Sequence, residues 1–293
     1  MLRLVDLYVS WCSGLTSSRK ALGLLKKSGI VDGVETSGTG KEFFPIQELG
    51  LKASLHNPLR FYRLGLDDSG FVPKLLSEKQ IMGCCNASDP ETVGFHSGYS
   101  AVDNPKSNQS VILRHTIRNL NRLEKIIDKK LIFESCVYNK RFSFNSTNKG
   151  LFFVTNPVFM EKVLSETNSG FLFDISHNFV SGMTKKREGL YKGSIEDYFD
   201  EMLRVVGEKT FQLHVNVPLF DKQNGFDDYH KPFLRGDKVS DKIIDLTKRV
   251  ISASPNLKLI NLEISTGAEP EKHAQKMIQQ AKYFVSKVKL IKS

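Results

Sequence analysis

The chain has 293 residues, of which 40% are hydrophobic and 25% are charged, an ordinary composition for a globular protein. No run approaches the roughly 18 apolar residues that a membrane-spanning helix needs, and Asp6 within the apolar start of the chain argues against a signal peptide. The net charge of +10 is compatible with nucleic acid or another anionic partner, and equally with a lysine-rich composition that serves no partner.

The cysteines show no metal or disulfide framework. There are four of them, none in a CxxC pair, and Cys84 and Cys85 are adjacent and therefore poor disulfide partners for each other. This usage is typical of a reduced, intracellular protein. We therefore expect a cytoplasmic protein with no membrane partner.

Short apolar runs alternate with amphipathic segments along the whole chain. The runs predict strands at residues 2–9, 31–35 and 51–56, followed by strands that end at residues 96, 134, 174, 214 and 263. Helices are expected at residues 19–27, 76–85, 110–129, 195–206, 237–252 and 270–287, with another that starts near Pro157. Loops are expected at residues 56–74, 135–150 and 181–194, and after the strand that ends at residue 214.

Strands that alternate with helices in this way are typical of an α/β protein with a single (β/α)8 TIM barrel. We predict one such domain over residues 1–293. In this fold the active site forms at the carboxyl ends of the barrel strands, so the residues that end each strand are the first candidates for chemistry.

The expected strands end in side chains that can bind a metal ion. Six of them share this feature: His56, His96, Glu134, Asp174, His214 and Glu263. Successive members are 40, 38, 40, 40 and 49 residues apart, about the length of one strand, one helix and two loops. Chance placement of histidines and carboxylates would not keep this period, so the pattern favours a shared site.

Three more residues complete the candidate set. His177 follows Asp174 in the segment GFLFDISHN, and Asp228 and His230 form a D-x-H pair in the loop expected after residue 214. Taken alone, Asp174 is equally well explained as the cap of the following segment. The recurrence favours a metal site, because a carboxylate with an imidazole is a ligand mixture that divalent metals prefer.

These nine residues, here called the ligand set, are too many for one ion, since a catalytic zinc typically takes three protein ligands. They suffice for two or three divalent ions, iron, zinc or manganese, with Glu134 and Glu263 as bridges. We expect Glu134, Glu263 and His177 to be catalytic. His115 and His273 lie off the pattern of strand ends and are left out.

Two expected loops at the barrel mouth carry cations and aromatic residues that suit an anionic or planar substrate. They are the segments 56–74 and 181–194, and the first is equally well explained as a lid packed on the barrel rim. The four residues assigned to substrate binding are Arg60, Tyr62, Lys185 and Arg187.

The ordered set H…H…E…DxxH…H…DxH…E resembles the xylose-isomerase-like TIM barrels, and two branches in particular. The first is endonuclease IV, the trinuclear-zinc apurinic-site nuclease, whose ligand order and approximate spacings match the whole ligand set. The second is the multinuclear non-haem iron oxidase family, whose members modify cysteines in ribosomally made peptides. Each resemblance implies a multinuclear metal centre, with nucleic acid as the partner in the first case and a peptide with a partner protein in the second.

The similarity to the oxidase family extends beyond the ligands. It includes TNPVF at residues 155–159, GFLFDISHNFVSG from residue 170, and DYHKP at residues 228–232. It covers about residues 30–265 and is strongest over residues 151–233. The oxidases typically have Asn where His177 stands and HLAGH where this chain has HVNVP. Endonuclease IV typically has DTCH and HLNDSK where this chain has DISH and HVNVP.

We therefore predict a multinuclear divalent-metal-dependent enzyme that is iron-oxidase-like, with an unidentified substrate. An endonuclease IV-like phosphodiesterase with a trinuclear zinc site is the first alternative. A sugar isomerase or epimerase is another, since His56 with Glu134 and Glu263 would serve such a reaction. A non-enzymatic barrel that keeps an inherited site also remains open.

Overall fold

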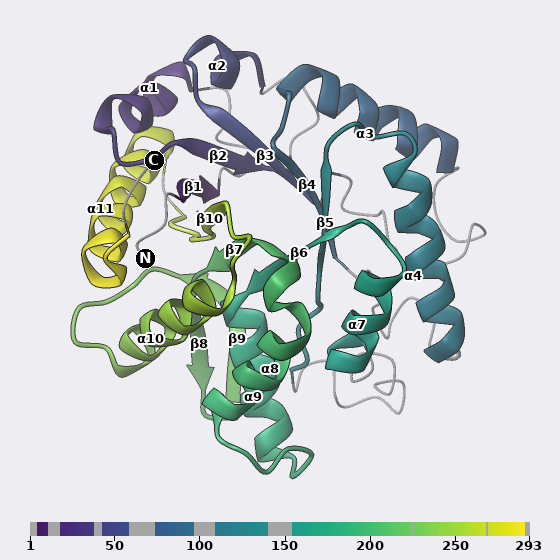
Figure 1. The fold of residues 1–293 in the computed structure, drawn as a ribbon. Helices are drawn as coiled ribbons and strands as arrows, with labels where there is room; N and C mark the ends of the chain where they lie inside the picture. Colours follow the sequence, from purple (N-terminus) through teal and green to yellow (C-terminus); the bar gives the residue numbers. More distant parts are fainter. Residues whose placement is uncertain are drawn as a thin grey trace.

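The computed structural model describes residues 5–10, 18–37, 43–58, 74–96, 109–139, 154–223, 225–267 and 269–290 (Figure 1). Within them, eight parallel strands close into a barrel in the order β1-β10-β7-β6-β5-β4-β3-β2. The barrel strands are β1 (Asp6–Ser10), β2 (Gly33–Thr36), β3 (Lys52–His56), β4 (Thr92–His96), β5 (Lys130–Glu134), β6 (Gly170–Asp174), β7 (Thr210–Val215) and β10 (Leu259–Leu262). The prediction of a (β/α)8 barrel is confirmed.

Helices cover the outside of the barrel (Figure 1). They are α1 (Arg19–Ser28), α2 (Phe43–Glu48), α3 (Lys74–Ser88), α4 (Gln109–Glu124), α7 (Pro157–Ser165), α9 (Ile195–Val206) with the short 3-10 turn η1 (Gly207–Lys209), α10 (Lys238–Ala253) and α11 (Pro270–Val288). Two elements are additional to the repeat, namely the helix α8 (Ile175–Arg187) and the antiparallel hairpin of β8 (Val217–Asp221) and β9 (Gly225–Lys231). No helix in the described part of the chain is long and apolar enough to cross a membrane.

The alternation of each strand explains why metal-capable side chains face the barrel interior. In β6, Phe173 points outward and packs against Phe199 of α9, with ring centroids 5.6 Å apart. In β5, Phe133 packs in the same way against Phe159 of α7, with centroids 6.0 Å apart. Because successive side chains in a strand point to opposite faces, the next residue in each strand, Asp174 in one and Glu134 in the other, must point inward.

The chain at residues 181–194 corrects one expectation. A basic, glycine-bearing loop is expected there, but α8 continues through it to Arg187. Gly182 marks a close helix contact rather than a loop, because a Cβ at this position would lie 2.6 Å from Ile195 and 2.9 Å from Tyr198, both in α9. The absence of a side chain is what lets α8 approach α9.

The segment after β7 corrects a second expectation. The D-x-H pair lies on β9 and not in a loop. The hairpin turns at Gly225, whose φ of 83° is in the left-handed region that glycine adopts without strain. Phe226 packs its ring against Phe179 of α8, with centroids 4.9 Å apart, so the hairpin rests on the helix that follows β6.

Candidate metal centre

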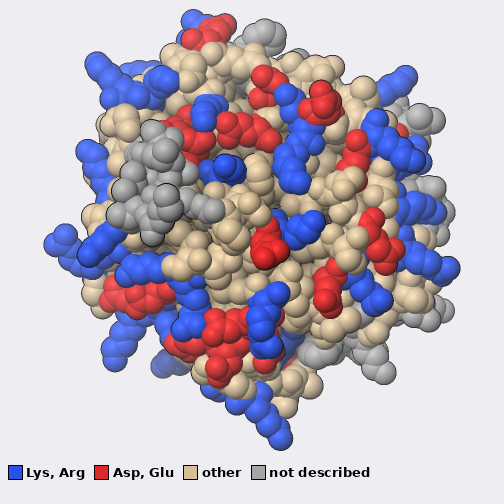
Figure 2. All heavy atoms as spheres, in the orientation of Figure 1, with Lys and Arg blue, Asp and Glu red and all other residues tan. Residues whose placement is uncertain are grey.

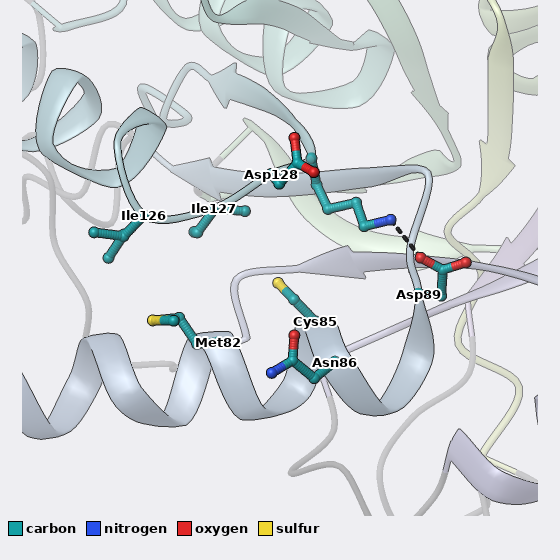
Figure 3. A pocket seen from close by; sticks show the side chains of 8 residues that line it. Met82, Cys85, Asn86, Asp89, Ile126, Ile127 and Asp128 are labelled. Atoms are coloured by element: carbon teal, nitrogen blue, oxygen red, sulfur yellow. Dashed lines mark hydrogen bonds and ion pairs between the residues drawn. The ribbon is translucent and has the colours of Figure 1, made fainter.

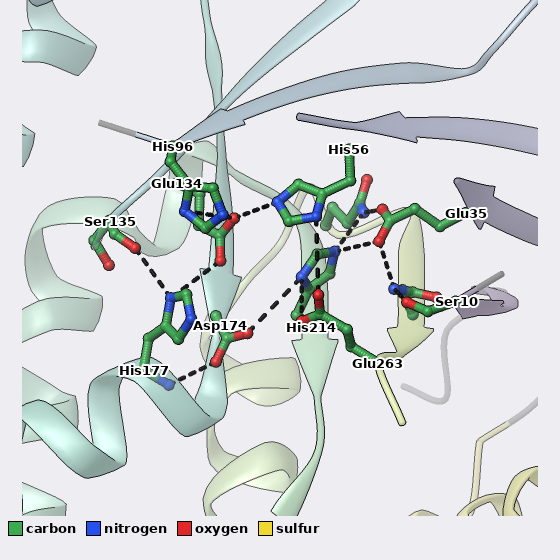
Figure 4. Close-up of polar contacts among 12 residues, drawn as sticks. Ser10, Glu35, His56, His96, Glu134, Ser135, Asp174, His177, His214 and Glu263 are labelled. Carbon is green, nitrogen blue, oxygen red and sulfur yellow. Dashed lines mark hydrogen bonds and ion pairs between the residues drawn. The ribbon is translucent and has the colours of Figure 1, made fainter. Parts of the chain in front are cut away.

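The carboxyl ends of the barrel strands bring the whole ligand set together, with contributions from β3, β4, β5, β6, β7, α8, β9 and the residue after β10. Figure 4 shows the side chains from β3 to β7, with His177 and Glu263, pointing toward one another at this mouth. A continuous series of nitrogen-to-oxygen contacts connects them, and four carboxylates organise it.

Glu134 lies at the centre of one half of the site. Its Oε2 atom is 2.7 Å from Nε2 of His56 and 3.4 Å from Nδ1 of His96. Its Oε1 atom is 3.2 Å from Nδ1 of His177. A buried carboxylate with imidazoles on both oxygens has the arrangement that a bridging ligand requires.

Glu263 has the equivalent place in the other half. Its Oε2 atom lies 3.1 Å from Nδ1 of His214 and 3.8 Å from Nε2 of His230. Its Oε1 atom lies 3.9 Å from Nδ1 of His56, which therefore faces both glutamates. The two halves are thus connected through His56.

Asp228 and Asp174 close the network. Asp228 Oδ2 is 3.1 Å from Nε2 of His177 and 2.9 Å from Nε2 of His230. Asp174 has two roles, because its Oδ1 accepts a hydrogen bond of 2.6 Å from the backbone N–H of His177, while its Oδ2 lies 3.8 Å from Nδ1 of His214. The cap and the metal-ligand interpretations of Asp174 are therefore compatible.

Burial and neighbouring charge shift the pKa values of the set in opposite directions. Burial lowers the pKa of His96 to about 4, against the attraction of Glu134. Burial also raises the pKa of Asp174 to about 7, although His177 opposes the shift. For His230, burial is outweighed by Glu263 and Asp228, which raise the pKa to about 10. Such divergent values in one cluster are typical of a functional site.

The chemistry of the donor atoms fits bound cations. Four buried atoms of the set make no well-formed hydrogen bond among the described residues: Glu134 Oε1, Asp174 Oδ2, His214 Nδ1 and Asp228 Oδ1. Two of them, Glu134 Oε1 and His214 Nδ1, meet only the ion-pair contacts of 3.2 and 3.1 Å given above. Buried polar atoms almost always have a partner, so a cation is the natural one for this mixture of oxygen and nitrogen donors. Four groups among the described residues have ligand atoms within 4.8 Å of one another: His56, His96 and Glu134; His177, Asp228 and His230; Glu134, Asp174 and His214; and Glu35, His56 and His214.

Sequence reasoning left out one residue of this centre, Glu35. It is the penultimate residue of β2 and only 2% exposed, and its Oε1 atom lies 2.8 Å from Nε2 of His214. The available signal was the acidic end of the strand expected at residues 31–35. It was not recognised because the contact joins residues 35 and 214, which only the closed barrel brings together.

The structure corrects the placement of two residues assigned to substrate binding. Lys185 is 4% exposed, and its Nζ atom donates a hydrogen bond of 2.9 Å to the carbonyl oxygen of Thr155. Arg187 ends α8 beside Gly225 at the hairpin turn, ten residues and therefore roughly 15 Å along the helix from His177. Neither lies at the ligand set, because the expected loop is a helix that leads away from it. Arg60 and Tyr62 lie outside the described residues.

A separate groove of about 370 Å³ lies at the opposite end of the barrel, between α3 and the segment that enters β5 (Figure 3). An ion pair between Lys129 and Asp89 crosses it. Burial raises the pKa of the Cys85 thiol in its wall to about 11, so this thiol is protonated and unreactive near neutral pH. The groove offers no chemistry comparable with that of the ligand set.

Comparisons with known proteins identify the fold. No protein-family model and no curated protein sequence matches the chain. A xylose isomerase domain containing protein from Salmonella typhimurium matches with a TM-score of 0.61 and 10% identity, over 98% of each chain. Endonuclease IV from Thermus thermophilus matches with a TM-score of 0.58 and 15% identity, over 95% of this chain and 99% of that one.

A third solved structure, of the IolI protein with a zinc atom, matches with a TM-score of 0.60 and 15% identity, over 97% of this chain and 98% of that one. At such identities the likeness establishes the fold. The chain therefore shares the (β/α)8 barrel fold of these proteins, and its ligand set stands at the carboxyl ends of the barrel strands.

Proposed function

We propose that this chain is a multinuclear divalent-metal-dependent enzyme of the non-haem iron oxidase type. The observation that carries the proposal is the convergence of nine metal-capable side chains, four atoms of which are buried without a well-formed hydrogen bond in the described residues. A barrel without metal would keep these buried donor atoms converging without a cation to satisfy them. Two or three ions account for the whole set.

In this proposal Glu134 and Glu263 bridge neighbouring ions, since each has imidazoles at contact distance on both of its oxygens. Bound iron supplies redox chemistry with dioxygen, whereas zinc supplies only Lewis acidity. His56 faces both bridges, and Asp174 fixes the start of α8 so that His177 is directed at Glu134 and Asp228.

The substrate reaches the centre from one side. The side chains of His230 and His96 are 33% and 27% exposed, whereas those of Glu134 and His214 are 0% exposed. We therefore place the substrate at the rim between His96 and His230, with Glu134 and His214 forming the closed floor.

In the described part of the chain, the distribution of charge favours an oxidase over a nuclease. A protein that holds a phosphodiester backbone needs cations beside the metal centre. Lys185 and Arg187 do not reach it, and Figure 2 shows basic and acidic side chains interspersed over the face drawn, without a single basic patch. The resemblance of residues 151–233 to the peptide-modifying oxidases supports a peptide substrate, presented with a partner protein.

A phosphodiesterase of the endonuclease IV type is the second candidate, because the order and spacing of the ligand set match that enzyme. The deciding experiment uses protein purified without added metal. The oxidase proposal predicts bound iron, a visible absorption band and dioxygen consumption with a cysteine-containing substrate peptide. Bound zinc with metal-dependent incision of a duplex that carries one abasic site would instead establish the nuclease.

A further inference from the structure

We propose that Glu35 is a positioning residue for the metal centre. It holds the His214 ring with its Nε2–H toward Glu35 and its unprotonated Nδ1 toward the ions. This inference rests on the proposed metal function and adds to it a residue outside the ligand set. Figure 4 shows Glu35 on the interior side of His214, away from Glu134 and His177.

The two nitrogens of His214 face different surroundings. Nε2 lies 2.8 Å from Oε1 of Glu35, while Nδ1 lies 3.1 Å from Oε2 of Glu263 and has no hydrogen-bond partner in the described part of the chain. A nitrogen that binds a metal carries no proton, so a neutral imidazole bound through Nδ1 must carry its proton on Nε2. That buried N–H then needs an acceptor, and Glu35 supplies it.

A single competitor among the described residues is the side chain of Gln212. Its Nε2 atom lies 3.2 Å from Nε2 of His214. The orientation of this amide is fixed, because its Oε1 accepts a hydrogen bond of 2.8 Å from the hydroxyl of Thr92. Gln212 therefore presents a donor to His214 and cannot accept its proton, which leaves the carboxylate as the acceptor.

The surroundings of Glu35 are built to keep it an acceptor. Asn261 donates to Oε1 at 2.6 Å, and Ser54 and Gln212 donate to Oε2. With His214, these donors occupy about the four acceptor positions that a carboxylate offers. The acceptor positions of this carboxylate are therefore filled by donors, with Nε2 of His214 among them.

This polar layer is unusual in its position. The interior of a TIM barrel is normally filled by bulky apolar side chains, and burying polar groups there is costly unless they find partners. Here Ser54, Gln212 and Asn261 are 0% exposed and all donate to Glu35. Through Glu35 the layer contacts His214 of the ligand set. The same hydrogen bonds therefore satisfy buried polar groups and orient His214.

The test compares variants of equal size with and without an acceptor. Glu35→Met removes both oxygens and should weaken zinc binding about 10- to 100-fold, the usual loss when the hydrogen-bond partner of a metal-bound histidine is removed. Glu35→Gln retains one acceptor oxygen and should lose less. The matched control is Glu78→Gln, which changes a buried carboxylate in α3 that is paired with Arg122 and should leave zinc affinity unchanged.

A second readout reports the proton directly. In zinc-loaded protein with 15N-labelled histidine, long-range proton–nitrogen correlation should show the proton of His214 on Nε2, with its signals identified by their loss in His214→Gln. A proton on Nδ1, or wild-type affinity in Glu35→Met, would overturn the role of Glu35 alone. Failure of the wild type to bind either zinc or iron(II) would overturn the proposed function as well. The wild-type spectrum decides the tautomer even where a Glu35 variant does not fold.

Discussion

At the residue scale, Asp174 shows how one side chain serves both the fold and the site. One of its oxygens caps α8 and the other faces His214. Asp174→Asn retains an oxygen that can cap the helix but loses the negative charge, so it should lose metal while the stability of the metal-free protein changes little. Asp174→Ala removes the cap too and should cost about 1 kcal/mol more.

Chemical denaturation of the metal-free proteins, followed by circular dichroism, measures the difference in free energy of unfolding between these two variants. Metal content is measured on the same samples. Equal stability of Asp174→Asn and Asp174→Ala would show that the cap contributes nothing, and full metal content in Asp174→Asn would remove Asp174 from the ligand set.

The pKa of His230 predicts the pH dependence of metal binding. Glu263 and Asp228 overcome its burial and raise this pKa to about 10, so the metal-free side chain carries a proton near neutral pH. Against burial, neighbouring carboxylates raise the pKa values of His177 and His214 as well. Metal ions must displace these protons, and affinity should therefore rise at least roughly tenfold per pH unit between about pH 6 and 8. Competition with a chelator at several pH values measures this slope. A flat profile would mean that no proton leaves the site when metal binds.

At the element scale, the β8–β9 hairpin is the part of the site most open to disturbance, because it carries two ligands and stands outside the barrel sheet. Asn139 donates a hydrogen bond of 2.7 Å to Asp227, the neighbour of Asp228. His230 has a φ of 48°, and its carbonyl oxygen accepts a hydrogen bond of 2.8 Å from the N–H of Ser265. Contacts from outside the hairpin thus hold a ligand in a strained backbone conformation.

Asn139→Ala should therefore weaken the binding of one ion and leave the others in place, because only Asp228 and His230 depend on the hairpin. Stepwise metal titration followed by native mass spectrometry resolves the individual ions. Asn121→Ala is the control, since Asn121 donates to a carbonyl oxygen on the outside of the barrel. Uniform weakening of every ion in Asn139→Ala would show that the hairpin does not act as a separate element.

The barrel strands and α8 show which features of the fold the sequence predicts. Strand ends at His56, His96, Glu134 and Asp174 were predictable to the residue, because apolar runs and polar strand ends coincide there. The helical character of α8 was not predictable, because its glycine and basic residues are typical of a loop. Only the packing of Gly182 against α9 explains the glycine. The contact of Glu35 with His214 depends on barrel closure, which no local pattern encodes.

At the scale of the whole molecule, the site and the packed core are separable. Stability in this fold comes from the apolar layer between strands and helices and from the end of the barrel opposite the site. Glu134→Ala or Glu263→Ala should therefore lose at least one metal ion, because adjacent cations would face each other without a bridge. Each should also abolish activity, with the circular dichroism spectrum of a folded barrel unchanged.

His115→Ala is the control for both variants and should retain its full metal content, since His115 lies on α4 and belongs to none of the groups of clustered ligands in the described residues. Unchanged metal content in both glutamate variants would contradict the assignment of the bridges.

The number of ions bound per chain tests the central claim most directly. Metal-free protein is reconstituted anaerobically with iron(II), and in parallel with zinc, and each sample is weighed by native mass spectrometry after free metal is removed. The multinuclear centre predicts two or three ions per chain with at least one of these metals. One ion or none per chain with both metals would contradict it.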